Sequence, residues 1–220
     1  MAYEAIVFDM DGVLLEGYHT DRDIYRRAAT ETLVDFDTGV GSPPEELVDP
    51  ADAAVVRRLC EEYDVQADSF WGYREHASTT MENEEIEAGG REPFDDVEVL
   101  QELAEKHRLG IVSNNRQGTV RFVVGHFGWD AFVEGYRGRR PTLEDFDRMK
   151  PEPSFLDSAL EDLQVPASET IFVGDRLSDV VTAREVGTDS ALLVRDGEPP
   201  TGEADPTMQI SSLLELLELS

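Results

Sequence analysis

The chain opens with a short, mostly apolar run that ends abruptly in acidic residues. Tyr3 to Phe8 are followed at once by the sequence DMDG. An apolar run of this length without alternation is typical of a strand that is buried on both faces of a parallel sheet. The pattern therefore predicts a first strand that delivers carboxylates at its C-terminal end.

The segment from Leu15 to Glu92 shows a different pattern. No comparable strand is found there, and apolar residues recur three or four positions apart. This period indicates helices with one buried face, so we predict a helical insert that ends at a hinge formed by Gly89 and Gly90. The expected helices lie around Tyr25–Leu33, around Val55–Tyr63 and over Asp68–Glu87.

After residue 93, strand patterns alternate with helix patterns. Asp95 or Asp96 is expected to cap the first of these helices. Such alternation predicts a parallel sheet with helices on both faces, joined by right-handed crossovers. The expected strands cover residues 109–112, 132–136, 170–173 and 191–194.

These patterns predict an α/β fold in two parts. A Rossmann-like core with a parallel sheet would comprise residues 1–14 and 93–220, and a small all-α domain would comprise residues 15–92. In open parallel sheets, ligands bind beyond the carboxyl ends of the strands, near the point where the strand order reverses. The polar residues at the strand ends are therefore the candidates for chemistry.

Acidic residues follow two of the predicted strands. Carboxylates from Asp9, Asp11 and Asp175 would form a cluster that requires a hard cation such as Mg²⁺. Beside such a cation, a carboxylate can attack phosphorus and form an aspartyl-phosphate that water then hydrolyses. We predict Asp9 as the nucleophile and Asp11 as the general acid and base, with the Asp11 backbone carbonyl as a further metal ligand.

Other strand ends offer groups that can hold a phosphoryl group. Ser113 and Asn114 follow a strand, and Lys150 adds a fixed positive charge. Ser and Asn also form ordinary turns, and a lysine before proline commonly flanks a helix. Only Lys106 and Lys150 occur beside 17 arginines, which favours a function for Lys150. Arg116 has two interpretations, as a phosphate ligand or as a residue that faces the helical insert.

Four short motifs in order resemble those of haloacid dehalogenase-like hydrolases. They are DMDGVL, Ser113 of IVSNN, Lys150 of KPEP, and GDRLSD, and they extend across residues 9–179. Four motifs, each in the expected structural context, are far more specific than one. The resemblance implies that Asp9 and Asp175 bind magnesium and that Asp179 supports the metal, although Asp179 is equally well explained as the N-terminal residue of a helix.

The resemblance also implies what the enzyme does. The insert at residues 15–92 would be a cap that closes over the site and excludes water. The substrate would be a small phosphate monoester such as phosphoglycolate or a sugar phosphate. A phosphosugar mutase similar to β-phosphoglucomutase uses the same core motifs, and a non-catalytic protein that binds phosphorylated ligands is a more distant alternative. Dehalogenation is disfavoured because it needs neither Asp11 nor a metal.

Charge narrows the partners and the setting. The chain carries 48 acidic and 19 basic residues, a net charge of -29, which argues against nucleic acid and anionic membranes as partners. Abundant carboxylates with few lysines resemble proteins of salt-loving microbes, whose charge repulsion is screened by salt. The single Cys60 and the absence of a leader pattern in MAYEAIVF favour a cytoplasmic protein, which we expect to be a monomer or weak homodimer.

Two smaller features have competing interpretations. Arg137, Arg139 and Arg140 lie close together in an otherwise acidic chain, either as a clamp for an anionic group or, as we favour, as partners of surface carboxylates. The four histidines show no metal-binding spacing, and His19 is the one near enough to the first motif to approach a substrate.

Overall fold

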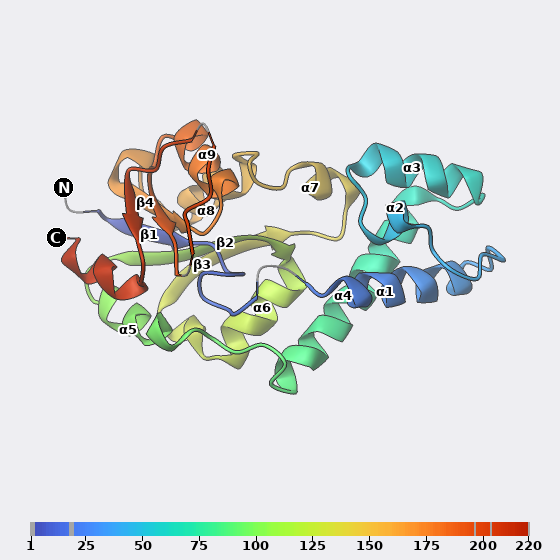
Figure 1. Cartoon of the computed structure of the whole chain (residues 1–220), viewed down its shortest axis with the longest axis horizontal. Coiled ribbons are helices and arrows are strands. Elements are labelled where there is room, and N and C mark those ends of the chain that lie inside the picture. The colour runs from blue at the N-terminus through green and yellow to red at the C-terminus, as the bar shows by residue number, and fades with distance from the viewer. Residues whose placement is uncertain (1–2, 18–19, 196, 203, 220) are drawn as a thin grey trace.

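A six-stranded parallel sheet forms the centre of the protein, in the strand order β3-β2-β1-β4-β5-β6 (Figure 1). The computed structural model describes residues 3–17, 20–195, 197–202 and 204–219. Both chain ends lie at the same end of the molecule, far from helices α1 to α4 (Figure 1). The strands are β1 Ala5–Phe8, β2 Arg108–Arg116, β3 Val133–Arg139, β4 Thr170–Gly174, β5 Asp189–Leu193 and β6 Met208–Ile210.

Strand β1 shows why helices cover both faces of the sheet. Successive side chains of a strand point to opposite faces, so Ile6 and Phe8 join one apolar cluster while Ala5 and Val7 join another. All four are completely buried. The first cluster includes residues of α5 (Val99–Leu103) and α6 (Gln117–His126), and the second includes residues of α8 (Ser154–Leu163) and α9 (Leu177–Val186). The predicted α/β fold is thereby confirmed.

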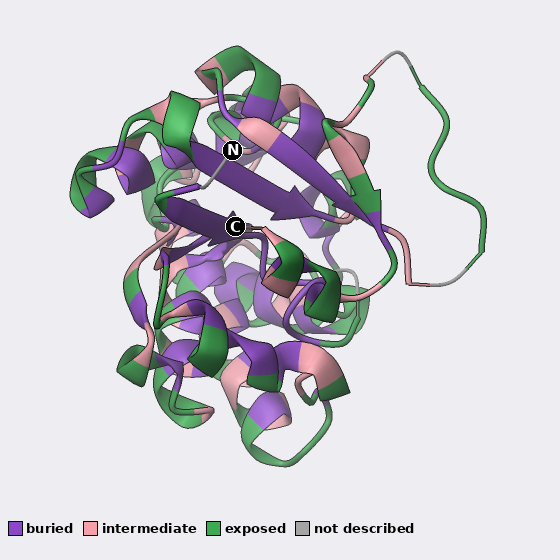
Figure 2. Ribbon diagram, turned by 90° about the vertical axis from the view of Figure 1, so that its left-hand side faces the viewer, coloured by how far each residue is buried: buried purple, intermediate pink, exposed green. Residues whose placement is uncertain are grey.

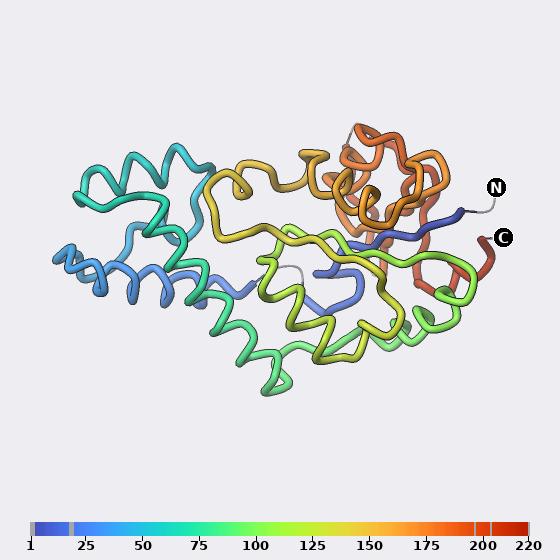
Figure 3. Tube along the Cα trace, turned by 180° about the vertical axis from the view of Figure 1, so that it is seen from behind, coloured from blue at the N-terminus to red at the C-terminus, as the bar shows by residue number. Residues whose placement is uncertain are grey.

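A group of helices extends beyond the sheet (Figures 1 and 3). It has an apolar cluster of its own, to which Leu33, Val56, Phe70 and Trp71 belong. Figure 2, seen from the other end of the molecule, shows the central strands of the sheet buried and the helices around them with both buried and exposed parts. The group consists of α1 Arg22–Asp35, α2 Glu45–Val48, α3 Ala53–Glu62 and α4 Ala67–Glu87.

A segment from the second half of the chain joins this cluster. Helix α7, Leu143–Asp147, contributes Leu143 and Phe146, and the Phe146 ring lies 4.6 Å from that of Trp71. The long connection after β3 therefore packs against the helical group. Because a core segment shares this cluster, a domain division into 1–14 with 93–220 and 15–92 stays a prediction.

The helix expected after residue 95 differs from the prediction. It consists of a 3-10 turn at Asp95–Glu98 followed by the five-residue α5, and neither Asp95 nor Asp96 caps it. Asp96 instead accepts hydrogen bonds from Arg195, from the hydroxyl of Ser212 and from the backbone N–H of Leu213. These partners lie far along the chain, so the local sequence could not reveal them.

Strand β2 extends beyond its predicted end. Its last residue, Arg116, is aligned with Arg139 of β3, so Ser113 and Asn114 lie within the strand and not after it. The reversal of strand order falls beside β1, whose Phe8 is aligned with Val173 of β4. The carboxyl ends of β1 and β4 therefore lie side by side.

Candidate active site

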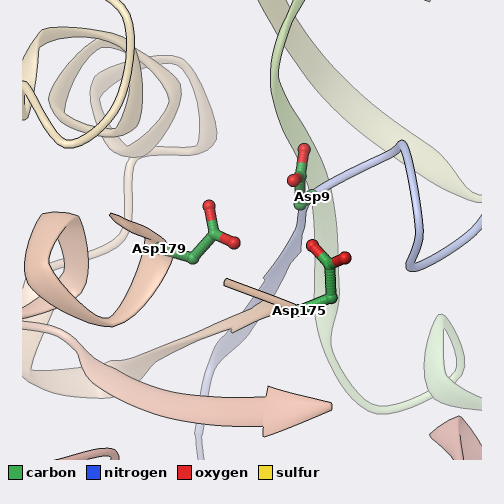
Figure 4. A group of neighbouring side chains, drawn as sticks. All are labelled: Asp9, Asp175 and Asp179. Atoms are coloured by element: carbon green, nitrogen blue, oxygen red, sulfur yellow. The ribbon is translucent and has the colours of Figure 1, made fainter. Parts of the chain in front are cut away.

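Three carboxylates meet at the reversal of strand order. Asp9 follows β1, Asp175 follows β4, and Asp179 lies in the first turn of α9. One oxygen from each lies within 4.8 Å of the others, and Figure 4 shows the three side chains together beyond the strand ends. The alignment of β1 with β4 brings the first two together, and the turn into α9 supplies the third.

This cluster is suited to a divalent metal. Within the described chain, Oδ1 of Asp175 is buried without a hydrogen bond, and the nearest cation, Arg176 Nε, is 3.9 Å away. Burial, reinforced by the charge of Asp179, raises the pKa of Asp175 to about 6. Burial also raises the pKa of Asp9 to about 7, although Lys150 opposes this shift. The negative charges of these carboxylates are therefore costly unless a cation compensates them. Carboxylate oxygens are ligands that Mg²⁺ prefers.

Asp179 lies at the start of α9 and also belongs to the group of three carboxylates. Its Oδ2 accepts a hydrogen bond of 3.1 Å from the backbone N–H of Arg176 at the start of α9. Its Oδ1 lies 2.8 Å from Nζ of Lys150, on the side of the carboxylate cluster. A helix N-terminal role and a place beside the metal group are therefore compatible. Whether Asp179 binds metal directly stays a prediction.

Lys150 lies at the centre of this charge cluster. Its Nζ is 2.9 Å from Oδ1 of Asp9 and donates a hydrogen bond to the carbonyl of Val112. Burial alone would lower the pKa of Lys150, but Asp179 and Asp9 outweigh it and raise the pKa. The other lysine, Lys106, is exposed. The amine therefore remains charged beside the predicted nucleophile.

Asp11 is not part of this group of three carboxylates and is held by a separate set of donors. Its Oδ1 accepts a hydrogen bond of 2.7 Å from Arg91, and its Oδ2 accepts one of 3.1 Å from the side chain of Asn115. The hydroxyl of Ser113 lies 3.4 Å from the same Oδ2. This carboxylate is thus not among the three grouped as metal ligands, as a general acid and base requires.

The remaining phosphate-binding candidates fall in different places. Ser113 lines a cavity that Asp9 and Lys150 also line, and its hydroxyl accepts a hydrogen bond from the N–H of Asn115. Asn114 pairs with the backbone of Lys150, accepting from its N–H at 2.7 Å and donating to its carbonyl. Arg116 is buried against Glu82 of α4, which matches its second interpretation, that it faces the helical insert.

A cavity of about 440 Å³ joins these residues to the helical group. Its core side is formed by Asp9, Asp11 and Lys150. Its other side is formed by residues from four separate elements: Tyr25 of α1, Trp71 and Arg74 of α4, Arg139 of β3 and Phe146 of α7. Of these, only Arg139 was a candidate binding residue from the sequence, because the others lie in helix patterns that give no local signal for binding.

The arginine cluster at the end of β3 divides into two kinds. Arg137 pairs with Asp162 and Arg140 pairs with Asp145 near the surface, in agreement with the favoured interpretation. Arg139 is buried and lines the cavity. His19 lies outside the described residues.

Sequence comparison identifies the family. A family model described as haloacid dehalogenase-like hydrolase matches residues 3–187. The chain belongs to this family. Pyrophosphatase PpaX of Anoxybacillus flavithermus is 26% identical over 230 residues, covering 100% of this chain and 97% of that protein. A phosphoglycolate phosphatase of Vibrio parahaemolyticus is 28% identical over 249 residues, covering 97% and 94%. The chain is therefore a hydrolase whose relatives are phosphatases.

Solved structures show the same fold. CbbY from Rhodobacter sphaeroides in complex with phosphate has a TM-score of 0.67 at 20% identity, covering 97% of this chain and 96% of that one. A haloacid dehalogenase-like phosphatase from Thermococcus onnurineus has a TM-score of 0.60 at 19% identity, covering 98% and 97%. Among the described residues, no helix has the length and apolar character needed to cross a membrane.

Proposed function

We propose that this protein is a Mg²⁺-dependent phosphatase that hydrolyses a small phosphate monoester through an aspartyl-phosphate on Asp9. The observation that carries this proposal is the division of acidic groups within one site. Asp9 lies in the metal-suited cluster beside Lys150, whereas Asp11 is held apart on Arg91 and Asn115. A nucleophile and an acid are thus available at the same cavity.

The reaction proceeds in two steps. An Asp9 oxygen attacks phosphorus, the bond to the ester oxygen breaks, and Asp11 donates its proton to the departing alkoxide to give an alcohol. Asp11, now ionised, takes a proton from water as that water attacks the aspartyl-phosphate. Inorganic phosphate leaves, Asp9 regains its carboxylate, and Asp11 again carries its proton.

The other residues of the site would bind the phosphoryl group, position Lys150 or hold the metal. Lys150 and the hydroxyl of Ser113 would bind the phosphoryl oxygens, and Asn114 would hold the lysine backbone in place. Asp9, Asp175 and the carbonyl of Asp11, with Asp179 as direct or outer support, would hold Mg²⁺. When bound, the metal would neutralise the phosphate and the carboxylate cluster.

The helical segment at residues 15–92 would act as a cap. Its α4 lines the cavity together with the core residues, and Gly89 and Gly90 connect the end of α4 to the sheet. Closure of such a segment would exclude water during formation of the aspartyl-phosphate. The protein would act on a small metabolite in the cytoplasm, as a monomer or weak homodimer.

The relatives indicate the kind of substrate. A phosphoglycolate phosphatase and a pyrophosphatase both match nearly the full chain, and a small phosphorylated substrate would suit a cavity of about 440 Å³. Phosphoglycolate and small sugar phosphates are the esters to assay first.

Phosphate release tests this function. Wild type, Asp9→Asn and the exposed control Asp157→Asn would be assayed with a panel of esters in high-salt buffer, with Mg²⁺ or with a chelator. Magnesium-dependent release by wild type and Asp157→Asn, together with loss of at least about a thousandfold in Asp9→Asn, is expected. Release that survives in a folded Asp9→Asn protein would overturn the mechanism.

A further inference from the structure

The cavity borders a buried network with more positive than negative groups. Four guanidinium groups and three carboxylates are linked there by ion pairs, and every member of the network is at most 9% exposed. At least one positive charge is left over even when all three carboxylates are ionised, in a protein whose net charge is -29. A buried charge without a partner is costly, so an excess cation indicates a missing anion. The cations are Arg74, Arg91, Arg116 and Arg139, and the anions are Asp11, Glu75 and Glu82.

The excess belongs to the part of the network around Arg74. Arg74 and Arg139 share a single carboxylate, Glu75, which pairs with one through each oxygen. Arg91 and Arg116 share Glu82, and Arg91 also has Asp11. Within this network, Arg74 and Arg139 are therefore the two cations that depend on a single anion.

Donor groups near Arg74 also lack partners. Nη2 of Arg74 donates to the carbonyl of Val48, but its Nε–H has no acceptor among the described residues. The indole N–H of Trp71, which lies about one helical turn before Arg74 on α4, likewise has no acceptor in the described chain. The guanidinium carbon of Arg74 lies 4.4 Å from the centre of the Tyr25 ring and 4.8 Å from that of Trp71. Aromatic rings thus orient the arginine without neutralising its charge.

Electrostatics agrees with this geometry. Burial lowers the pKa of Arg74, and the neighbouring cation of Arg139 adds to that effect, although Glu75 opposes it. By contrast, the pKa of the equally buried Arg116 is raised. Of these two buried arginines, Arg74 is the one whose charged form is disfavoured by its surroundings.

Arg74, Arg139 and Trp71 line the same cavity as Asp9 and Lys150. Asp49 also lines it but is exposed to solvent, where its charge is screened. We infer that the Arg74 side of the cavity binds a second anionic group of the substrate while the first phosphate lies at Asp9. This inference rests on the proposed function and assigns the substrate to phosphate esters that carry a further carboxylate or phosphate.

A matched series of esters tests this site. Ethyl phosphate has a neutral tail, phosphoethanolamine a cationic tail, phosphoglycolate a carboxylate, and ethylene glycol bisphosphate a second phosphate. The kcat/KM of the wild type is expected to be at least about tenfold higher for one of the two esters with a second anionic group than for ethyl phosphate, and lowest for phosphoethanolamine. Which of those two esters is preferred distinguishes a carboxylate site from a phosphate site.

Arg74→Gln provides the decisive variant, with Arg140→Gln as its surface control. The selectivity ratio is kcat/KM for the preferred ester with a second anionic group divided by kcat/KM for ethyl phosphate. This ratio should fall at least about tenfold in Arg74→Gln. It should keep its wild-type value in Arg140→Gln. An unchanged ratio in Arg74→Gln would overturn the inference. So would a wild type that prefers neither ester with a second anionic group to ethyl phosphate.

A binding measurement covers the case in which Arg74→Gln does not fold. Phosphonoacetate and ethylphosphonate differ by the second anion, and their competitive inhibition constants can be measured on wild type alone. Phosphonoacetate should bind at least about tenfold more tightly, and equal inhibition would contradict a second anionic site. Turnover of ethyl phosphate that persists in Asp9→Asn would refute the proposed function instead, so the two failures are distinguishable.

Discussion

Arg91 donates a hydrogen bond of 2.7 Å to Oδ1 of Asp11, the predicted general acid and base. The same guanidinium donates to Glu82 of α4 at 2.8 Å and to the backbone carbonyls of Glu16 and Gly17. Arg91 lies just after α4 on the returning connection, and Glu16 and Gly17 lie on the outgoing one. One side chain therefore ties the acid to both chain connections between the sheet and the helical segment.

Replacing Arg91 should impair catalysis more than substrate binding. In Arg91→Gln, Asp11 would lose its cationic partner and its fixed orientation, and kcat is expected to fall by about tenfold or more with a smaller change in KM. Steady-state kinetics measures both constants, with Arg184→Gln as an exposed control. A change confined to KM would show that Arg91 does not position the acid.

Glu82 should be important for stability. It is completely buried and pairs with Arg91 and Arg116, so Glu82→Gln would leave two buried cations with less compensation. A loss of about 3 kcal/mol in the free energy of unfolding is expected. Urea denaturation at constant high salt measures this loss. Glu46→Gln, which alters an exposed pair with Arg58, should not differ measurably from wild type.

Magnesium should stabilise the protein more at high pH than at low pH. Folding raises the pKa of Asp9 to about 7 and that of Asp175 to about 6, so the folded, metal-free protein holds these protons more tightly than the unfolded chain does. Both groups therefore favour folding at low pH, and this contribution is lost as pH rises from about 4 to about 7. Because Mg²⁺ binds the ionised carboxylates, its effect should increase over the same range.

Thermal unfolding with Mg²⁺ or with a chelator, at pH 5 and at pH 8, measures this dependence. The increase in Tm caused by Mg²⁺ should be clearly larger at pH 8, and Asp175→Asn should reduce it. An equal increase at both pH values would show that the carboxylate cluster is not the binding site.

Salt should stabilise this protein strongly. A net charge of -29 creates self-repulsion, which about 1 M salt screens to within about 3 Å. Tm is therefore expected to rise continuously between dilute buffer and 2 M KCl. Scanning calorimetry across that range checks this, and a Tm independent of KCl would contradict the proposed adaptation to salt.

Some features could be predicted because they depend on local sequence. The apolar run before Asp9 and the helical period of residues 68–87 each reflect which side chains must be buried, and α4 begins one residue from its predicted start. Five of the six strands of the parallel sheet followed from strand and helix alternation. Strand β6, with only three residues, was too short to give a pattern.

Other features depend on contacts between distant segments. Arg91 and Glu82 differ from other charged residues only in where the fold places them. Arg74 lines the cavity because α4 is joined to the ends of β2 and β3 by the pairs of Glu82 with Arg116 and of Glu75 with Arg139. Lys150 could be singled out since lysine is so rare in this chain. In a sequence rich in arginine and glutamate, no comparable signal marks the buried pairs.

Trapping the covalent intermediate tests the central claim most directly. The enzyme would be mixed with Mg²⁺ and a good ester substrate, quenched in acid within the first turnover, digested and examined by mass spectrometry. The account predicts a phosphoryl group on the peptide that contains Asp9, and none in Asp9→Asn. A phosphoryl group on another residue, or full turnover without any phosphorylated protein in the first turnover, would contradict it.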